Sequence, residues 1–134
     1  MERKTLLVVD DQQELGELVQ QIFRRRGFRV LGASDGAAAL EQVASERPDL
    51  ILLDLNLPKV DGWQVCRRLK EDPDTRRIPI IMMTAAHTTL DDAQVGLGLG
   101  ADEYLAKPFL REVLVHNVER LLGGETGEAE PLPE

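Results

Sequence analysis

The chain has 134 residues, about the length of one domain, and 43% of them are hydrophobic, so a core of ordinary size can form without a metal or a disulfide. Its single cysteine, Cys66, excludes an internal disulfide, and the sequence contains no run of 18 apolar residues and no secretory signal, which favours a soluble cytoplasmic protein. The formal net charge of −8 argues against direct nucleic-acid binding, which requires a basic surface.

The first half of the chain predicts three strands and two helices. A buried strand over 5–10 precedes a helix whose apolar residues recur at i, i+3, i+4, i+7 and i+8: Leu15, Leu18, Val19, Ile22 and Phe23. Gly27 ends this helix, and a second strand follows over 28–33. Ser34 or Asp35 is a suitable cap for a second helix that runs to Glu46. Pro48-Asp49 then opens a third strand, which ends at Leu53.

The second half continues the alternation. Asp61 is a plausible cap for a third helix, which Asp72-Pro73-Asp74 ends. A fourth strand is predicted at 78–83, a weaker helix at 88–98, a short fifth strand at 103–106 and a final helix up to 122, ended by Gly123-Gly124. Five continuous apolar strands that alternate with helices predict an α/β protein with a parallel, doubly wound sheet and helices on both faces.

Oxygen-bearing side chains stand at the carboxyl ends of three predicted strands: Asp10 and Asp11 after the first, Asp54 after the third and Thr84 after the fourth. Ligands of such sheets bind at this edge. Hard oxygen ligands suit Mg²⁺, with Mn²⁺ as a substitute, and Mg²⁺ together with a carboxylate suits phosphoryl transfer onto Asp54. Lys107, after the fifth strand, could neutralise phosphoryl oxygens, and a cis Lys107-Pro108 peptide would turn its ammonium into the pocket.

The combination of Asp10-Asp11, Asp54, Thr84 and Lys107-Pro108 resembles the signature of response-regulator receiver domains of two-component signalling. The segments 57–62 and 100–109 strengthen this resemblance, and the match runs from about residue 5 to residue 122. It implies a flavodoxin-like sheet of five strands in the order 2-1-3-4-5. It also implies a receiver domain over 1–122, followed by an acidic tail over 123–134 that we expect to be disordered.

The resemblance also implies a role for each site residue. Asp54 would be the phosphoacceptor, and Mg²⁺ would be bound by Asp11, by Asp54 and by the backbone carbonyl of Asn56, with Asp10 acting through water. Thr84 and Lys107 would contact the phosphoryl oxygens, and Thr84 and Tyr104 would form the conformational switch. Asn56 and Ala86 occupy the positions that tune the lifetime of the aspartyl phosphate, and Ala86 cannot hydrogen-bond an attacking water.

The expected partners are a histidine kinase or phosphotransfer protein and a downstream effector protein. The effector would dock on the surface of the fourth helix, fifth strand and fifth helix, and the protein would be a monomer or a phosphorylation-linked dimer. The twelve residues after Leu122 are too few for a DNA-binding or catalytic domain, so we expect output through a partner or in a longer regulator. The chain would be a switch that phosphorylates and dephosphorylates itself, rather than a turnover enzyme, and would bind neither nucleic acid nor membrane.

Each residue alone has a plainer interpretation. Asp10-Asp11 could cap a helix, Thr84 could be an ordinary strand-end hydroxyl, Lys107 could be solvated and Tyr104 could be only a half-buried strand residue. Two rival functions also stay open. One is an interaction module that works without phosphorylation, and the other is an aspartyl phosphatase acting on small molecules. The phosphatase motif would require a second carboxylate at position 56, where this chain has asparagine.

Overall fold

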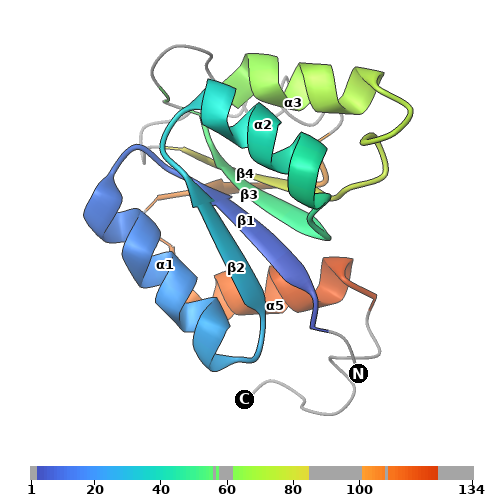
Figure 1. Ribbon diagram of the computed structural model, residues 1–134. Helices are drawn as coiled ribbons and strands as arrows, with labels where there is room; N and C mark the ends of the chain where they lie inside the picture. Colours follow the sequence, from blue (N-terminus) through green and yellow to red (C-terminus); the bar gives the residue numbers. More distant parts are fainter. Residues whose placement is uncertain (1–2, 56, 58–61, 85–100, 108, 124–134) are drawn as a thin grey trace.

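The computed structural model describes residues 3–55, 57, 62–84, 101–107 and 109–123 (Figure 1). Its strands and helices, in chain order, are β1 (Thr5–Val9), α1 (Gln13–Arg25), β2 (Arg29–Ala33), α2 (Gly36–Glu46), β3 (Leu50–Asp54), α3 (Gly62–Glu71), β4 (Ile80–Thr84), β5 (Glu103–Ala106) and α5 (Arg111–Leu121). The helix predicted at 88–98 and residues 124–134 of the predicted tail lie outside the described residues.

The five strands form one parallel sheet in the order β2-β1-β3-β4-β5, which confirms the predicted flavodoxin-like topology. Alternate strand residues face opposite sides, so two cores form. Leu6 and Val8 of β1 pack with α1 and α5, whereas Leu7 and Val9 pack with α2 and α3. Figure 1 shows the same arrangement, with α2 and α3 on one face of the sheet and α1 and α5 on the other. The continuous apolar strands are explained by this burial on both faces.

Several predicted boundaries differ from the structure by one or two residues. Phe28 was expected in the second strand, but its N–H donates to the carbonyl of Phe23 in the turn after α1, and β2 begins at Arg29. The fourth strand begins at Ile80 instead of 78, because the N–H of Ile78 donates to Thr75 in a turn, and it includes Thr84. The two predicted alternatives for the second helix cap are resolved in favour of Asp35, whose side chain accepts from the N–H of Ala38.

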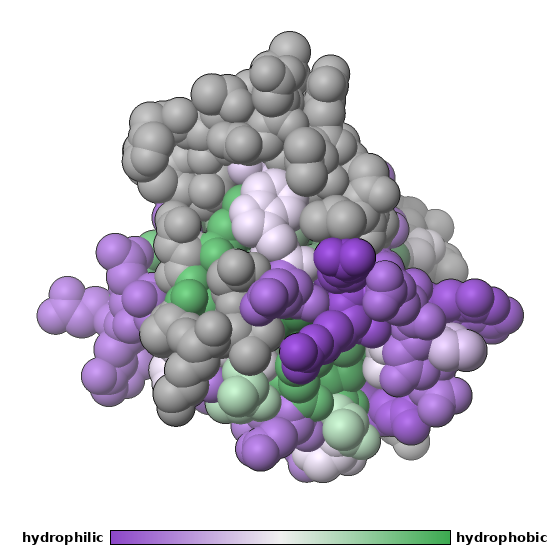
Figure 2. Space-filling view, turned by 90° about the horizontal axis from the view of Figure 1, so that it is seen from above, coloured by the Kyte–Doolittle hydropathy of each residue, from purple (hydrophilic) through white to green (hydrophobic). Residues whose placement is uncertain are grey.

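Seen from above in the orientation of Figure 1, the described surface is largely polar, with smaller apolar areas between the polar side chains (Figure 2). Among the described residues, the exposed large hydrophobic side chains are those of Leu18, Leu110 and Val113. None of the helices in the described ranges combines the length and apolar composition needed to cross a membrane.

Candidate functional site

Three carboxylates meet at the carboxyl edge of the sheet. Asp54 is the last residue of β3, and Asp10 directly follows β1, in which Val9 is paired with Leu53 of β3. This register places Asp10 beside Asp54. One carboxylate oxygen from each of Asp10, Asp11 and Asp54 lies within 4.8 Å of the others. Asp10 and Asp54 are buried, whereas Asp11 is exposed, so the cluster opens to solvent on the Asp11 side.

Lys107 brings a positive charge to the same cluster. It follows β5 directly, and its Nζ lies 3.1 Å from Oδ2 of Asp54 and 3.2 Å from Oδ2 of Asp10. The lysine side chain is only 16% exposed, so solvent screens these interactions weakly. The ammonium of Lys107 is therefore within hydrogen-bond distance of two buried carboxylates. The group of three aspartates and one lysine keeps an excess of negative charge.

The pKa of Asp10 reflects chiefly the burial of its carboxylate. Burial raises it above the ordinary value, and the nearby charge of Asp54 raises it further. Two interactions oppose this shift. The backbone N–H of Gln12 donates to Oδ1 at 2.9 Å, and the ammonium of Lys107 favours the ionised form. Burial has the largest effect, so Asp10 holds a proton more readily than an exposed aspartate does.

Asp54 lies where α3 approaches the end of β3 very closely. A Cβ placed on Gly62, the first residue of α3, would lie 2.5 Å from the carbonyl oxygen of Asp54 and 2.6 Å from Cα of Leu55. The backbone holds this approach, since the N–H of Gly62 donates to Leu55 and that of Leu55 donates to Met83. Only glycine fits at position 62 without displacing the backbone that carries Asp54.

The remaining predicted site residues are only partly accounted for. Thr84 ends β4 and is paired with Ala106 of β5, so its backbone lies at the same edge of the sheet. Tyr104 is a partly buried residue of β5, and its buried hydroxyl has no hydrogen-bond partner among the described residues. Asn56, Ala86 and Pro108 lie outside the described residues, so the predicted carbonyl ligand, lifetime position and cis peptide are untested.

Two supporting residues carried no individual role in the sequence-based prediction. One is Gly62, which the sequence-based prediction placed only within a loop motif. The available signal was a glycine at the junction between the loop after a buried strand and an amphipathic helix. The other is Asp102, whose Oδ2 accepts from the N–H of Ile80 at 2.9 Å and from Nζ of Lys70 at 3.3 Å. Asp102 thereby fixes the start of β4 and the chain just before β5. Hydrophobic periodicity in a sequence does not predict a contact of this kind.

The acidic cluster fits a hard divalent cation. Mg²⁺ is bound in proteins by one or two carboxylates and completes its shell with water and phosphate oxygens. Asp10, Asp11 and Asp54 supply three convergent carboxylates, and the exposure of Asp11 leaves room for water. The donor set lacks the histidine and thiolate ligands that zinc prefers.

Comparison with known proteins places the chain in one family. Residues 6–119 match the family model of the response regulator receiver domain. The chain therefore belongs to the response regulator receiver family.

Individual relatives agree with this assignment. The chain is 45% identical over 106 residues to the alkaline phosphatase synthesis transcriptional regulatory protein PhoP of Bacillus subtilis, an alignment that covers 79% of this chain and 43% of that protein. It is 44% identical over 131 residues to the DNA-binding response regulator MtrA of Mycolicibacterium smegmatis, covering 97% of this chain and 56% of MtrA. The chain thus spans about half the length of the curated relatives it matches.

Solved structures show the same fold. The signal receiver domain of a signal transduction histidine kinase from Syntrophus aciditrophicus is 32% identical, with a TM-score of 0.83 and 98% of each chain covered. The receiver domain of response regulator 1452 from Francisella is 28% identical, with a TM-score of 0.83; the comparison covers 90% of this chain and 97% of that domain.

Proposed function

We propose that this receiver domain accepts a phosphoryl group on Asp54 from the phosphohistidine of a histidine kinase or phosphotransfer protein. One observation carries the proposal. The carboxylates of Asp10, Asp11 and Asp54 converge within 4.8 Å, and Lys107 lies 3.1 Å from Asp54. A buried carboxylate beside a cation and an acidic metal-binding cluster is the arrangement that carboxylate phosphorylation requires.

In the proposed transfer, a carboxylate oxygen of Asp54 forms a bond to phosphorus as the bond from phosphorus to the donor nitrogen breaks. Lys107, already within hydrogen-bond distance of Asp54, would neutralise phosphoryl oxygens, and Thr84 would donate a hydrogen bond to them. Asp11, Asp54 and the backbone carbonyl of Asn56 would hold Mg²⁺, with Asp10 acting through water. A bound Mg²⁺ would stabilise the negative charge that develops on the transferred group.

The proposed output is a change at the surface formed by β5, α5 and the segment before β5. Tyr104 supports this proposal because its buried hydroxyl has no hydrogen-bond partner in the described part of the chain, so a rearrangement that supplied one would be stabilised by the new hydrogen bond. Phosphorylation would favour that rearrangement through Thr84, as a shift between two populated states. An effector protein, a second copy of the chain or a covalently attached domain would respond to the altered surface.

We further propose that the receiver unit extends over residues 1–122, with 123–134 as an acidic extension, and that it works in the cytoplasm, where its phosphodonor acts. The protein would act as a switch that modifies itself and hydrolyses its own acyl phosphate, without turnover of a separate substrate.

Incubation with acetyl phosphate and Mg²⁺, followed by measurement of the intact mass, tests the proposal. We expect one phosphoryl adduct on the wild type, none on Asp54→Asn and none when EDTA removes Mg²⁺. If the wild type stays unmodified while a control receiver is modified, an interaction module that works without phosphorylation is favoured. Turnover of p-nitrophenyl phosphate that is lost in Asp54→Asn would instead indicate a phosphatase.

A further inference from the structure

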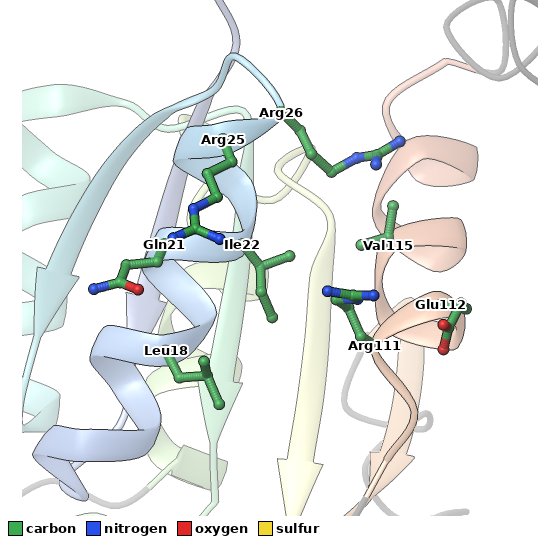
Figure 3. A pocket seen from close by; sticks show the side chains of 8 residues that line it. All are labelled: Leu18, Gln21, Ile22, Arg25, Arg26, Arg111, Glu112 and Val115. Carbon is green, nitrogen blue, oxygen red and sulfur yellow. The ribbon is translucent and has the colours of Figure 1, made fainter.

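A groove of about 350 Å³ separates α1 from α5, on the face of the sheet opposite α2 and α3 (Figures 1 and 3). Its apolar lining comes from both helices: Leu18 and Ile22 from α1 and Val115 from α5. In Figure 3 the side chains of Leu18 and Ile22 extend into the space that faces α5. Leu18 is 55% exposed, which is unusual for a leucine on the helix face that borders the core. The groove thus offers an apolar contact that the described residues leave uncovered.

The rim of the groove is basic. Arg25, Arg26 and Arg111 line it, with Glu112 as an acidic lining residue. Arg26 extends from the end of α1 toward α5 and forms an ion pair of 2.9 Å with Glu119, as its direction in Figure 3 allows. Among the described residues neither Arg25 nor Arg111 has an ion-pair partner, although the protein carries a net charge of −8. An acidic ligand with a small apolar side chain would complement both features.

This chain itself contains such a segment. Residues 124–134 carry no lysine or arginine and hold four glutamates, Glu125, Glu128, Glu130 and Glu134, together with the apolar Leu132. The segment follows Gly123, whose N–H donates to the carbonyl of Arg120 at the end of α5. The Arg26–Glu119 pair joins this end of α5 to the end of α1. The acidic segment therefore starts beside the basic rim.

Its length is sufficient. Eleven extended residues span up to about 36 Å, whereas the 13 residues of α1 are about 20 Å long, so the segment can reach along the whole groove. Attachment also raises its local concentration to the millimolar range for a short flexible connection. Weak electrostatic attraction then suffices for substantial occupancy, which a separate acidic partner at cellular concentration would not achieve as readily.

We propose that residues 124–134 bind in the groove between α1 and α5, with their glutamates against Arg25 and Arg111 and Leu132 against the apolar lining. The contact does not depend on phosphorylation of Asp54. It would cover Leu18 and neutralise Arg25 and Arg111.

A nitroxide spin label tests the proposal in the full chain. Cys66 is buried and burial raises the pKa of its thiol to about 11, so a cysteine introduced by Ala129→Cys can be labelled selectively. We expect the label to broaden amide NMR signals along α1 and the first turns of α5 much more than those of α2 and α3. Added salt should reduce this difference, because the contact is largely electrostatic.

Three variants decide what causes the broadening. Arg25→Glu/Arg111→Glu should abolish it, whereas Arg67→Glu/Arg68→Glu, an equal charge change on exposed residues of α3, should preserve it. Neutralising the segment with Glu125→Gln, Glu128→Gln and Glu130→Gln should also abolish it, without any change to the folded elements. Uniform broadening, or selective broadening that survives Arg25→Glu/Arg111→Glu, would overturn the proposal. If the segment leaves the groove free and a separate acidic peptide fills it, the site belongs to a partner and the proposal fails.

Discussion

The ammonium nitrogen of Lys107 lies 3.1 Å from Oδ2 of Asp54, although 53 residues separate them in the chain. The same nitrogen lies 3.2 Å from Oδ2 of Asp10. Both carboxylates are almost fully buried, so their charges are poorly hydrated, and among the described residues one ammonium is paired with both of them. A divalent cation would remove this imbalance. Loss of a negative charge from the site should therefore stabilise the metal-free protein, but it should reduce the stabilisation that Mg²⁺ provides.

Replacing Lys107 should destabilise the metal-free protein. Lys107→Met leaves the carboxylates of Asp10 and Asp54 buried without their cation, and loss of one partner of a buried pair costs about 3 kcal/mol of unfolding free energy. Urea denaturation in EDTA measures this loss, and added Mg²⁺ should restore part of it. Arg67→Met, which removes an exposed pair with Glu71, should change stability by about 0.5 kcal/mol or less. Equal losses in the two variants would contradict the buried-pair interpretation.

Removing the charge of Asp10 should have the opposite effect. Asp10→Asn should raise the unfolding free energy in EDTA at pH 7 by about 1 kcal/mol, the common size of single-site effects, because it leaves Asp54 and Lys107 as a balanced pair. The same variant should lose most of the stabilisation by Mg²⁺. Thermal denaturation with and without Mg²⁺ measures both effects, and a less stable variant in EDTA would refute the charge-imbalance account.

The gain in unfolding free energy of Asp10→Asn over the wild type should increase with pH. The native pKa of Asp10 is raised above the ordinary value of 3.8, so the folded state holds this proton more tightly than the unfolded state. The contribution of Asp10 to stability is then greatest below pH 3.8 and is lost as the pH rises through the native pKa. The stability difference between Asp10→Asn and wild type should therefore grow from acid toward neutral pH. Carboxylates remote from Asp10 cancel in this difference, which would stay constant if the pKa of Asp10 were the same in the folded and unfolded states.

Adding one methyl group at position 62 should disturb the phosphoacceptor. In Gly62→Ala the new Cβ would lie 2.5 Å from the carbonyl oxygen of Asp54, so the backbone of α3 or β3 must move, at a cost of about 2 kcal/mol. The rate of phosphorylation by acetyl phosphate should fall as well. Gly16→Ala is a matched control, because its Cβ would meet Asp10 Cβ at an ordinary 3.6 Å within a helix. Comparable losses in both variants would show that close approach to Asp54 is not the cause.

A polar side chain at position 86 should shorten the life of the phosphorylated state. Ala86 cannot orient a water molecule for attack on the aspartyl phosphate, whereas glutamate can accept a hydrogen bond from that water. Decay of the phosphoprotein, followed by intact mass after removal of acetyl phosphate, should be faster in Ala86→Glu than in wild type. Ala37→Glu, an exposed position of α2, controls for added negative charge. An unchanged decay rate in Ala86→Glu would refute the assignment of this position.

The fold was largely predictable because its signals are local and repeated. The apolar strands, the helical stripe from Leu15 to Phe23 and the Asp35 cap each act within a few residues, and the structure contains all of them. Strand ends were less predictable, since tertiary hydrogen bonds decide them. The N–H of Asp49 donates to the carbonyl of Thr5, and its Oδ2 accepts from the N–H of Thr5, so β3 begins only at Leu50.

The site was predictable to the extent that strand ends define it. Asp10, Asp11 and Asp54 converge because parallel strands place their carboxyl ends at one edge. The close approach at Gly62 and the double contact of Asp102 with Lys70 and Ile80 could not be foreseen, because they depend on how separate elements pack. The groove between α1 and α5 likewise arises only when helices 86 residues apart in sequence, measured from Arg25 to Arg111, lie side by side.

Locating the phosphorylated side chain shows whether Asp54 is the phosphoacceptor. After reaction with acetyl phosphate and Mg²⁺, borohydride reduction converts an aspartyl phosphate into homoserine, and tandem mass spectrometry then identifies the modified position. We expect homoserine at position 54 in the wild type, and none there when EDTA is present during phosphorylation. Homoserine at Asp10 or Asp11 with Asp54 intact, or no homoserine in a protein that binds Mg²⁺, would contradict it.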